Sequence, residues 1–135
     1  MRIFLDANVL FAASKRGSSV EKLLNLLLKK GTALTSDYAL REAKRNIDAK
    51  RPGWAEDFSV LTSAIEIASS TKWELSVQLV EKDVPILCTA IREKCNYLLT
   101  GDKRDFGHLY GTVIQGVEII SLPAMADLLL AQWDC

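Results

Sequence analysis

Short apolar segments alternate with longer amphipathic segments from one end of the chain to the other. Five of the apolar segments are typical of β-strands: Arg2–Leu5, Thr32–Thr35, Glu66–Ser69, Asn96–Thr100 and Val117–Ile120. The stretches between them carry helix signals. Strands separated by helices predict a parallel sheet that is covered by helices on both faces and connected by right-handed crossovers. We therefore expect an α/β fold with a central parallel sheet of about four to five strands.

Local start and stop signals mark the expected helices. Ser18 and Glu21 form a capping-box pattern ahead of a leucine-rich run, which ends at Lys30 and Gly31. Further helices are expected from Ser36 or Asp37 through Asp48, over about Trp54–Ala64, from Asp83 toward Cys95, and after Ser121. Residues 70–82 are expected to form a loop with a short helix, and glycines punctuate a second loop region between 107 and 116.

The length and charge of the chain limit the classes of protein that fit it. A chain of 135 residues suits one domain, which we expect to span residues 1–135. Its 17 basic and 17 acidic residues cancel, which argues against a uniformly basic surface that wraps nucleic acid. A local basic rim remains open, and its candidates are Arg41, Arg45, Lys103 and Arg104. Each of these is explained equally well as part of a solvated helix end or loop.

The cysteines and the lone histidine do not suggest a disulfide framework or a zinc site. Cys88, Cys95 and Cys135 are an odd number without close pairing. On one helix, Cys88 and Cys95 would lie about 10 Å apart along the axis, too far to bridge. We expect them to be small buried hydrophobic residues. His108 has no second histidine or nearby cysteine with which to bind zinc.

The start of the chain and its apolar runs bear on its location. Met1–Leu5 runs directly into Asp6, which does not resemble a secretory signal. The apolar runs are too short to span a bilayer. We expect no membrane association and a cytoplasmic location.

Aspartates end two of the expected strands. Asp6 directly follows Arg2–Leu5, and Asp102 follows Asn96–Thr100 after one glycine. Ligands bind at the carboxyl ends of strands in an open parallel sheet, and an acid there is costly to desolvate. Either aspartate alone is explained as a helix cap or turn residue, but two of them at one edge favour a site. Asn8 and Thr100 stand beside them and could orient ligands or water.

Three further acids are candidates for the same site. Glu42 lies along one edge of the apolar stripe of its helix, so it is either paired with a base such as Arg45 or turned toward a site; the helix by itself favours pairing. Asp83 precedes Val-Pro and has the position of an N-cap, although a cap can also bind a metal through its second oxygen. Asp105 follows Asp102 by three residues.

The residue types of this set indicate the chemistry. Five acids without a histidine cluster provide hard oxygen ligands, which favour Mg²⁺ or Mn²⁺ over zinc. Phosphate esters are the usual substrates of such sites, where one ion, or two ions about 4 Å apart, activates a water and stabilises the leaving oxygen. No serine or cysteine nucleophile motif, phosphate-binding GxxxxGK[ST] or dinucleotide-binding GxGxxG is present.

The segments around these acids resemble the motifs of PIN-domain proteins. The matching segments, in chain order, are Phe4–Leu10, Leu40–Glu42, Lys82–Ala90, Leu98–Phe106 and the closing strand and helix that begin at Val117–Leu122. Each motif is weak, but the four acidic motifs in the right order are specific, and with the closing strand and helix the resemblance covers essentially the whole chain.

The resemblance implies a PIN-like three-layer α/β/α fold and Mg²⁺- or Mn²⁺-dependent endoribonuclease activity on RNA. It implies catalytic and metal-binding roles for Asp6, Glu42, Asp83 and Asp102, with Asp105 as an additional metal-binding acid. Many bacterial members are VapC-type toxins silenced by a small antitoxin, so a toxin–antitoxin pair is one expectation. The family also commonly pairs, and we expect a homodimer.

Other classes of protein fit the sequence less well. A haloacid-dehalogenase-type hydrolase would have Asp where Asn8 stands, and a response-regulator receiver would have adjacent acids after the first strand. The serious alternative is a catalytically silent PIN-like module that binds RNA or a protein partner. All the expected acids are retained, which argues against that alternative without proving turnover.

Overall fold

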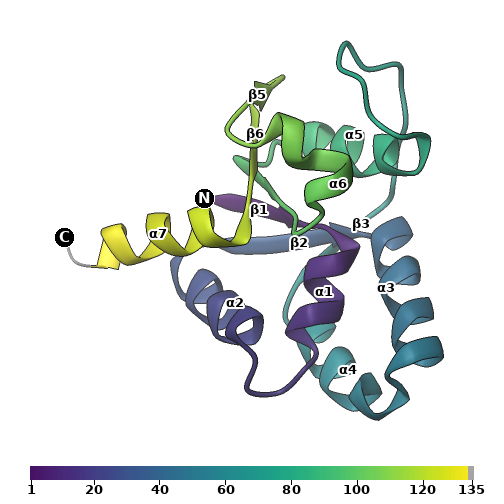
Figure 1. Ribbon diagram of the computed structural model, residues 1–135, viewed down its shortest axis with the longest axis vertical. Helices are drawn as coiled ribbons and strands as arrows, with labels where there is room; N and C mark the ends of the chain where they lie inside the picture. Colours follow the sequence, from purple (N-terminus) through teal and green to yellow (C-terminus); the bar gives the residue numbers. More distant parts are fainter. Residues whose placement is uncertain (134–135) are drawn as a thin grey trace.

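A six-stranded sheet forms the centre of the computed structural model, which describes residues 1–133 (Figure 1). The strand order is β3-β2-β1-β4-β6-β5, and all neighbouring strands are parallel except the pair β5 and β6. The strands are β1 (Arg2–Leu5), β2 (Thr32–Ser36), β3 (Glu66–Ala68), β4 (Tyr97–Leu99), β5 (Val113–Ile114) and β6 (Val117–Ile120). The five expected strands are confirmed, and β5 adds a short antiparallel strand at one edge.

Within residues 1–133, seven α-helices lie between or after the strands, and helices cover both faces of the sheet. They are α1 (Ala7–Ala13), α2 (Ser19–Lys30), α3 (Asp37–Lys50), α4 (Ala55–Ser63), α5 (Val84–Arg92), α6 (Lys103–Phe106) and α7 (Leu122–Trp133). Figure 1 shows α1, α2 and α4 on one side of the sheet and α5 on the other, while α3 packs against both α1 and α5. The expected α/β/α arrangement is therefore confirmed.

Two of the helix starts follow the predicted caps. Ser18 and Ser36 have extended backbones, and their hydroxyl oxygens accept hydrogen bonds from Glu21 N and Ala39 N. Gly31 does end α2, but with an extended φ of −166° rather than a left-handed one. A side chain at Gly31 would place its Cβ 2.5 Å from the carbonyl oxygen of Met1, so close packing against the start of β1 requires the glycine.

Two regions contain elements that the sequence did not predict. Helix α1 follows Asp6 directly and buries Val9 and Leu10, although it is too short to show a helical repeat in the sequence. The short helix α6 precedes the glycine-punctuated region, which itself contains a 3₁₀ turn (Gly107–Leu109), β5 and the turn that leads to β6. Gln115 and Gly116 both have positive φ, which a two-residue hairpin turn requires.

The core lies on both faces of the central strands. Ile3, Phe4 and Leu5 of β1 are fully buried, as expected for a strand between two helical layers. Cys88 and Cys95 are buried and free, which confirms the predicted role. The helix that contains Cys88 ends at Arg92 rather than reaching Cys95. The third cysteine, Cys135, lies outside the described residues.

The segment between β3 and α5 has almost no regular structure. Residues 69–80 form a loop, and a 3₁₀ turn (Glu81–Asp83) then leads into α5. The prediction of a loop with a short helix is therefore close to what the structure has. Among residues 1–133, no helix combines the length and the apolar character needed to cross a membrane.

Candidate metal centre

The carboxyl ends of β1 and β4 bring two of the predicted acids to one edge of the sheet. The two strands are parallel neighbours in which Leu5 pairs with Leu99, and the backbone N–H of Asp6 donates to the carbonyl of Leu99 at 3.1 Å. The residues that follow each strand therefore emerge side by side. Asp6 and Asp102 do so although they lie almost a hundred residues apart in sequence.

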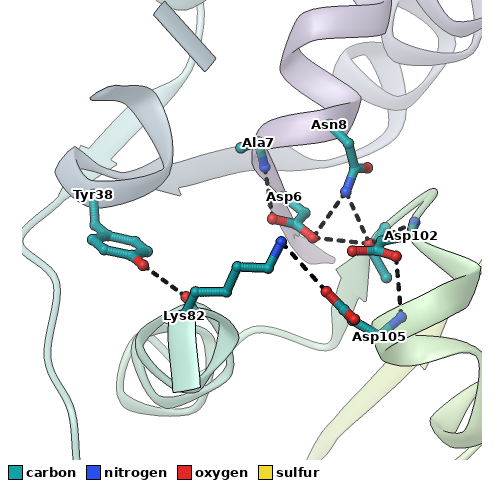
Figure 2. Close-up of polar contacts among 8 residues, drawn as sticks. Asp6, Ala7, Asn8, Tyr38, Lys82, Asp102 and Asp105 are labelled. Carbon is teal, nitrogen blue, oxygen red and sulfur yellow. Dashed lines mark hydrogen bonds and ion pairs between the residues drawn. The ribbon is translucent and has the colours of Figure 1, made fainter. Parts of the chain in front are cut away.

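Asp6 is held rigidly in a nearly dry environment (Figure 2). Its side chain caps α1 by accepting from Ala7 N at 2.7 Å, and its second oxygen accepts from Asn8 Nδ2 at 3.1 Å and Thr100 Oγ1 at 2.9 Å. Desolvation raises the pKa of Asp6 to about 6, the charge of Glu42 adds to this rise, and the hydrogen bonds oppose it. The aspartate is thus both a helix cap and a costly buried charge.

Asn8 and Thr100 join the two strand ends. Asn8 accepts a hydrogen bond from Gly101 N at 2.8 Å, and the hydroxyl oxygen of Thr100 accepts from Asp102 N at 3.1 Å. The carbonyl of Thr100 accepts from the hydroxyl of Tyr110 at 2.9 Å. These bonds fix the positions of Asp6 and Asp102 relative to one another, which is the geometry that an orienting role requires.

Three carboxylates meet beside this junction. Asp83, Asp102 and Asp105 each place an oxygen so that the three atoms all lie within 4.8 Å of one another. Asp105 stands one turn after Asp102, and its backbone N–H donates to Asp102 Oδ1 at 3.1 Å, which caps α6. Asp83 comes from the start of α5. The cluster therefore combines two separate segments, the start of α6 after β4 and the turn that leads into α5.

Asp83 does not cap α5, contrary to the prediction from its position. Its φ of −97° and ψ of −9° are already helical because it ends the preceding 3₁₀ turn, and its side chain makes no cap hydrogen bond. By contrast, the capping residues Asp6, Ser18 and Ser36 have ψ between 158° and 162°. The extended backbone aims a capping side chain back at the helix N–H groups, whereas the helical backbone of Asp83 does not.

The carboxylate of Asp83 is buried and has one oxygen without a hydrogen-bond donor among the described residues. Only 5% of the residue is exposed, and its buried Oδ2 finds no hydrogen-bond donor among the described residues. Desolvation raises the pKa of Asp83 well above its ordinary range, and the neighbouring charge of Asp6 raises it further. Buried carboxylate oxygens are normally paired or bound to a metal. A cluster of three carboxylates with one orphaned oxygen therefore fits a hard divalent cation.

Glu42 makes no ion pair among the described residues, and its charge acts on the groups of the site. Although the helix favoured pairing with Arg45, the ion pairs of residues 1–133 include none between these two residues. The charge of Glu42 instead raises the pKa of Asp6 and of Tyr38. Glu42 is half-buried and outside the three-carboxylate cluster, so it borders the site electrostatically.

A lysine that the sequence analysis did not single out also belongs to the site. Lys82 Nζ lies 3.4 Å from Asp105 Oδ2, and the backbone carbonyl of Lys82 accepts from the hydroxyl of Tyr38 at 2.8 Å (Figure 2). The charges of Asp83, Asp105 and Glu42 all raise the pKa of Lys82. The sequence offered one signal for this role, namely that Lys82 directly precedes the predicted metal-binding residue Asp83.

The four predicted basic residues are all exposed, as a basic rim requires. Arg41 and Arg45 lie on α3, and Lys103 and Arg104 lie on α6 next to Asp102 and Asp105. Lys103 and Arg104 lie near the acidic cluster because they stand between Asp102 and Asp105 in the sequence.

Comparisons with known proteins bear on the fold. No protein-family model and no curated protein matches the sequence. The structure is similar to a chain of VapBC2 from Rickettsia felis, solved bound to a DNA fragment from the promoter. The two chains share 23% sequence identity, and the match has a TM-score of 0.67 and covers 90% of this chain and 98% of that chain. The protein therefore has the three-layer α/β/α fold of a VapC-type PIN domain.

Proposed function

We propose that the protein is a Mg²⁺- or Mn²⁺-dependent endoribonuclease. The observation that carries this proposal is the buried, unpartnered Oδ2 of Asp83 beside the carboxylates of Asp102 and Asp105. The three acids would hold the ion, and Asp6 and Glu42 would deepen the negative potential around it. Oxygen-only ligands at the carboxyl edge of a parallel sheet suit phosphate-ester hydrolysis better than zinc or redox chemistry.

The residues of the chain would each contribute a distinct part of the activity. A bound divalent ion lowers the pKa of water and stabilises charge at the phosphoryl centre. Asn8 and Thr100 hold Asp6 and Asp102 in fixed positions, so little reorganisation is needed when substrate arrives. The exposed cations Arg45, Lys103 and Arg104 would attract the RNA backbone from the rim.

The same fold suggests a biological setting for the activity. The similar chain comes from VapBC2, and the sequence motifs resemble VapC-type toxins. We propose that the protein is the toxin of a toxin–antitoxin pair, acts in the cytoplasm and is silenced by a small antitoxin. Co-purification of a small protein encoded next to its gene, together with loss of RNA cleavage in the complex, is the expected result.

Cleavage of mixed single-stranded RNA tests the enzymatic proposal. We expect cleavage with Mn²⁺ or Mg²⁺, none with a chelator, and a loss of about two or more orders of magnitude for Asp102→Asn with either ion. Asp48→Asn is a matched control because Asp48 is exposed on α3 and pairs with Lys44 outside the cluster. RNA binding without cleavage under every metal condition would instead support the silent binding module.

A further inference from the structure

A large cleft opens beside the acidic cluster. Its volume is about 1110 Å³, at or above the upper end of the range of about 300–1,000 Å³ for small-molecule pockets. The loop of residues 72–80 forms one wall, and Val84, Arg104, Asp105 and His108 form the other. In Figure 1 this loop is the teal segment that leads into α5.

The loop that forms the cleft is tied to its surroundings near both ends. Thr71 N donates to the hydroxyl of Thr89 at 3.0 Å, and Trp73 N donates to Cys88 Sγ at 3.4 Å, so α5 holds the first part. The carbonyl of Gln78 lies 3.1 Å from His108 Nε2, which joins the last part to the turn after α6. The cleft is therefore formed before any ligand arrives.

The cleft is continuous with the candidate metal centre. Asp105 lines the cleft and also belongs to the cluster with Asp83 and Asp102. Val84, on the same wall, directly follows Asp83. A polymer whose phosphate lies at the carboxylate cluster would therefore place its neighbouring units in the cleft.

The chemistry of the walls suits unpaired nucleotides. The apolar lining includes the half-buried indole of Trp73 together with Leu75, Val77, Leu79 and Val80. Bases of single-stranded RNA stack on aromatic side chains and pack on apolar ones. Arg104 is exposed at the rim, and no carboxylate of the described residues lies within ion-pair distance of it. Its guanidinium is thus available to a phosphate.

We propose that this cleft binds one or more unpaired bases of the RNA next to the cut phosphate and thereby sets which sequence is cut. The inference rests on the proposed ribonuclease function. An apolar wall that ends at a carboxylate cluster, with an unpaired arginine on its rim, matches a ligand that alternates planar bases with phosphates. A protein segment in the cleft is the competing occupant.

A charge placed in the cleft tests the proposal. Val80 lines the cleft and is 45% exposed, so Val80→Asp should fold while placing a carboxylate against the bases. Val60→Asp is the matched control, because Val60 is 66% exposed on α4 and does not line the cleft. Urea denaturation should show that both variants are folded. The probe is a mixed-sequence single-stranded RNA, titrated without metal so that binding is measured apart from cleavage.

The proposal has a defined expected result. Val80→Asp should weaken binding of the probe by about tenfold or more, the loss expected when one stacked base is displaced, whereas Val60→Asp should stay within about twofold of the parent. In Mn²⁺, sequencing of the cut ends should show a changed base preference for Val80→Asp only. Arg104→Gln should also weaken binding and flatten its dependence on salt.

The contrary results separate this proposal from the proposed function. If Val80→Asp binds the probe and cuts the same sequences as the parent, the cleft is not an RNA subsite, and a protein segment remains as its occupant. The ribonuclease proposal stands in that case. If the parent binds the probe through the cleft but never cuts it with any metal, the ribonuclease proposal fails and the binding site stands.

Discussion

The ammonium group of Lys82 lies 3.4 Å from the carboxylate of Asp105, at the edge of the three-carboxylate cluster. The lysine side chain is 59% exposed, whereas that of Asp105 is 13% exposed, so the cation is the part of the pair that is free to move. The ammonium group of Lys82 supplies positive charge at the place where the cluster would hold a divalent ion. A divalent ion bound at the cluster would therefore compete with this ammonium group.

Lys82→Met should tighten the binding of Mn²⁺ several-fold, because a metal ion then meets no competing ammonium group. Without metal, the variant should lose little stability, about 1 kcal/mol or less, because the Lys82 ammonium group is largely in water and its ion pair is screened. Titration calorimetry with Mn²⁺ measures the affinity. Lys72→Met is the control, since Lys72 pairs with exposed Glu81 at the same 3.4 Å. Unchanged or weaker Mn²⁺ binding by Lys82→Met would contradict the competition.

Mg²⁺ or Mn²⁺ should raise the melting temperature of the protein. An ion that binds the folded site and not the unfolded chain stabilises by about 2.7 kcal/mol at a hundredfold excess over its dissociation constant. Millimolar affinity would make the shift smaller. Asp48→Asn should keep the shift, and Asp102→Asn should lose most of it. No change in the melting temperature of the parent up to tens of millimolar metal would count against the site.

Asp6→Asn and Asp102→Asn should each abolish most RNA cleavage, by about two or more orders of magnitude, because charge stabilisation and positioning fail together. Asn also serves as a helix cap, so Asp102→Asn should keep the start of α6. Cleavage of a labelled RNA with Mn²⁺ and urea denaturation without metal are measured side by side. Destabilised variants that still cut at the parent rate per folded molecule would end the nuclease interpretation.

The metal-free protein should become more stable as the pH falls from about 8 to about 5. The folded-state pKa values of Asp6, about 6, and Asp83 lie above the ordinary 3.8, so in this range the folded protein binds more protons than the unfolded chain. The burial of Asp6 costs about 3 kcal/mol above its folded pKa. About half of this cost is relieved by the time the pH has fallen to about 5, and the rest as the pH falls to the unfolded pKa of 3.8. Asp37 and Asp105 have lowered pKa values and act the opposite way only at lower pH.

The dependence on pH is measured as the midpoint of urea unfolding at each pH, in a buffer with a chelator that removes divalent metal. Asp83→Asn should raise the midpoint at pH 8 and flatten the profile, because it removes a buried charge that has no donor. The exposed control Asp48→Asn should leave the profile unchanged. A midpoint of the parent that falls steadily between pH 8 and pH 5 would show that the buried acids are stabilised by partners instead of destabilised by burial.

The protein should form a homodimer at micromolar concentration. This expectation comes from the apolar content of the chain and from the resemblance to a family that commonly pairs. Light scattering gives the mass directly. A mass equal to that of one chain, 15.0 kDa, would contradict it.

The sequence by itself determined most of the strands and helices and the edge of the sheet at which the strand-end acids lie. The apolar runs before Asp6 and Asp102 predict strands, and the caps Ser18 and Ser36 predict helix starts, because each signal depends on neighbours within a few residues. Parallel pairing then follows from the alternation of elements. It brings the ends of β1 and β4 to one edge, as Leu5 opposite Leu99 shows.

Only the tertiary structure decided what each acid does there. The position of Asp83 resembled that of a cap, but the preceding turn gives it a helical backbone and burial leaves its Oδ2 without a donor. Glu42 could have paired with Arg45 along its helix, yet it borders Asp6 from a different element. The position of Lys82 against Asp105 and the cleft under residues 72–80 depend on loops without a periodic sequence signal. Burial, pairing and the electric field at a site depend on atoms that folding brings together from distant segments. Local sequence patterns do not predict these contacts.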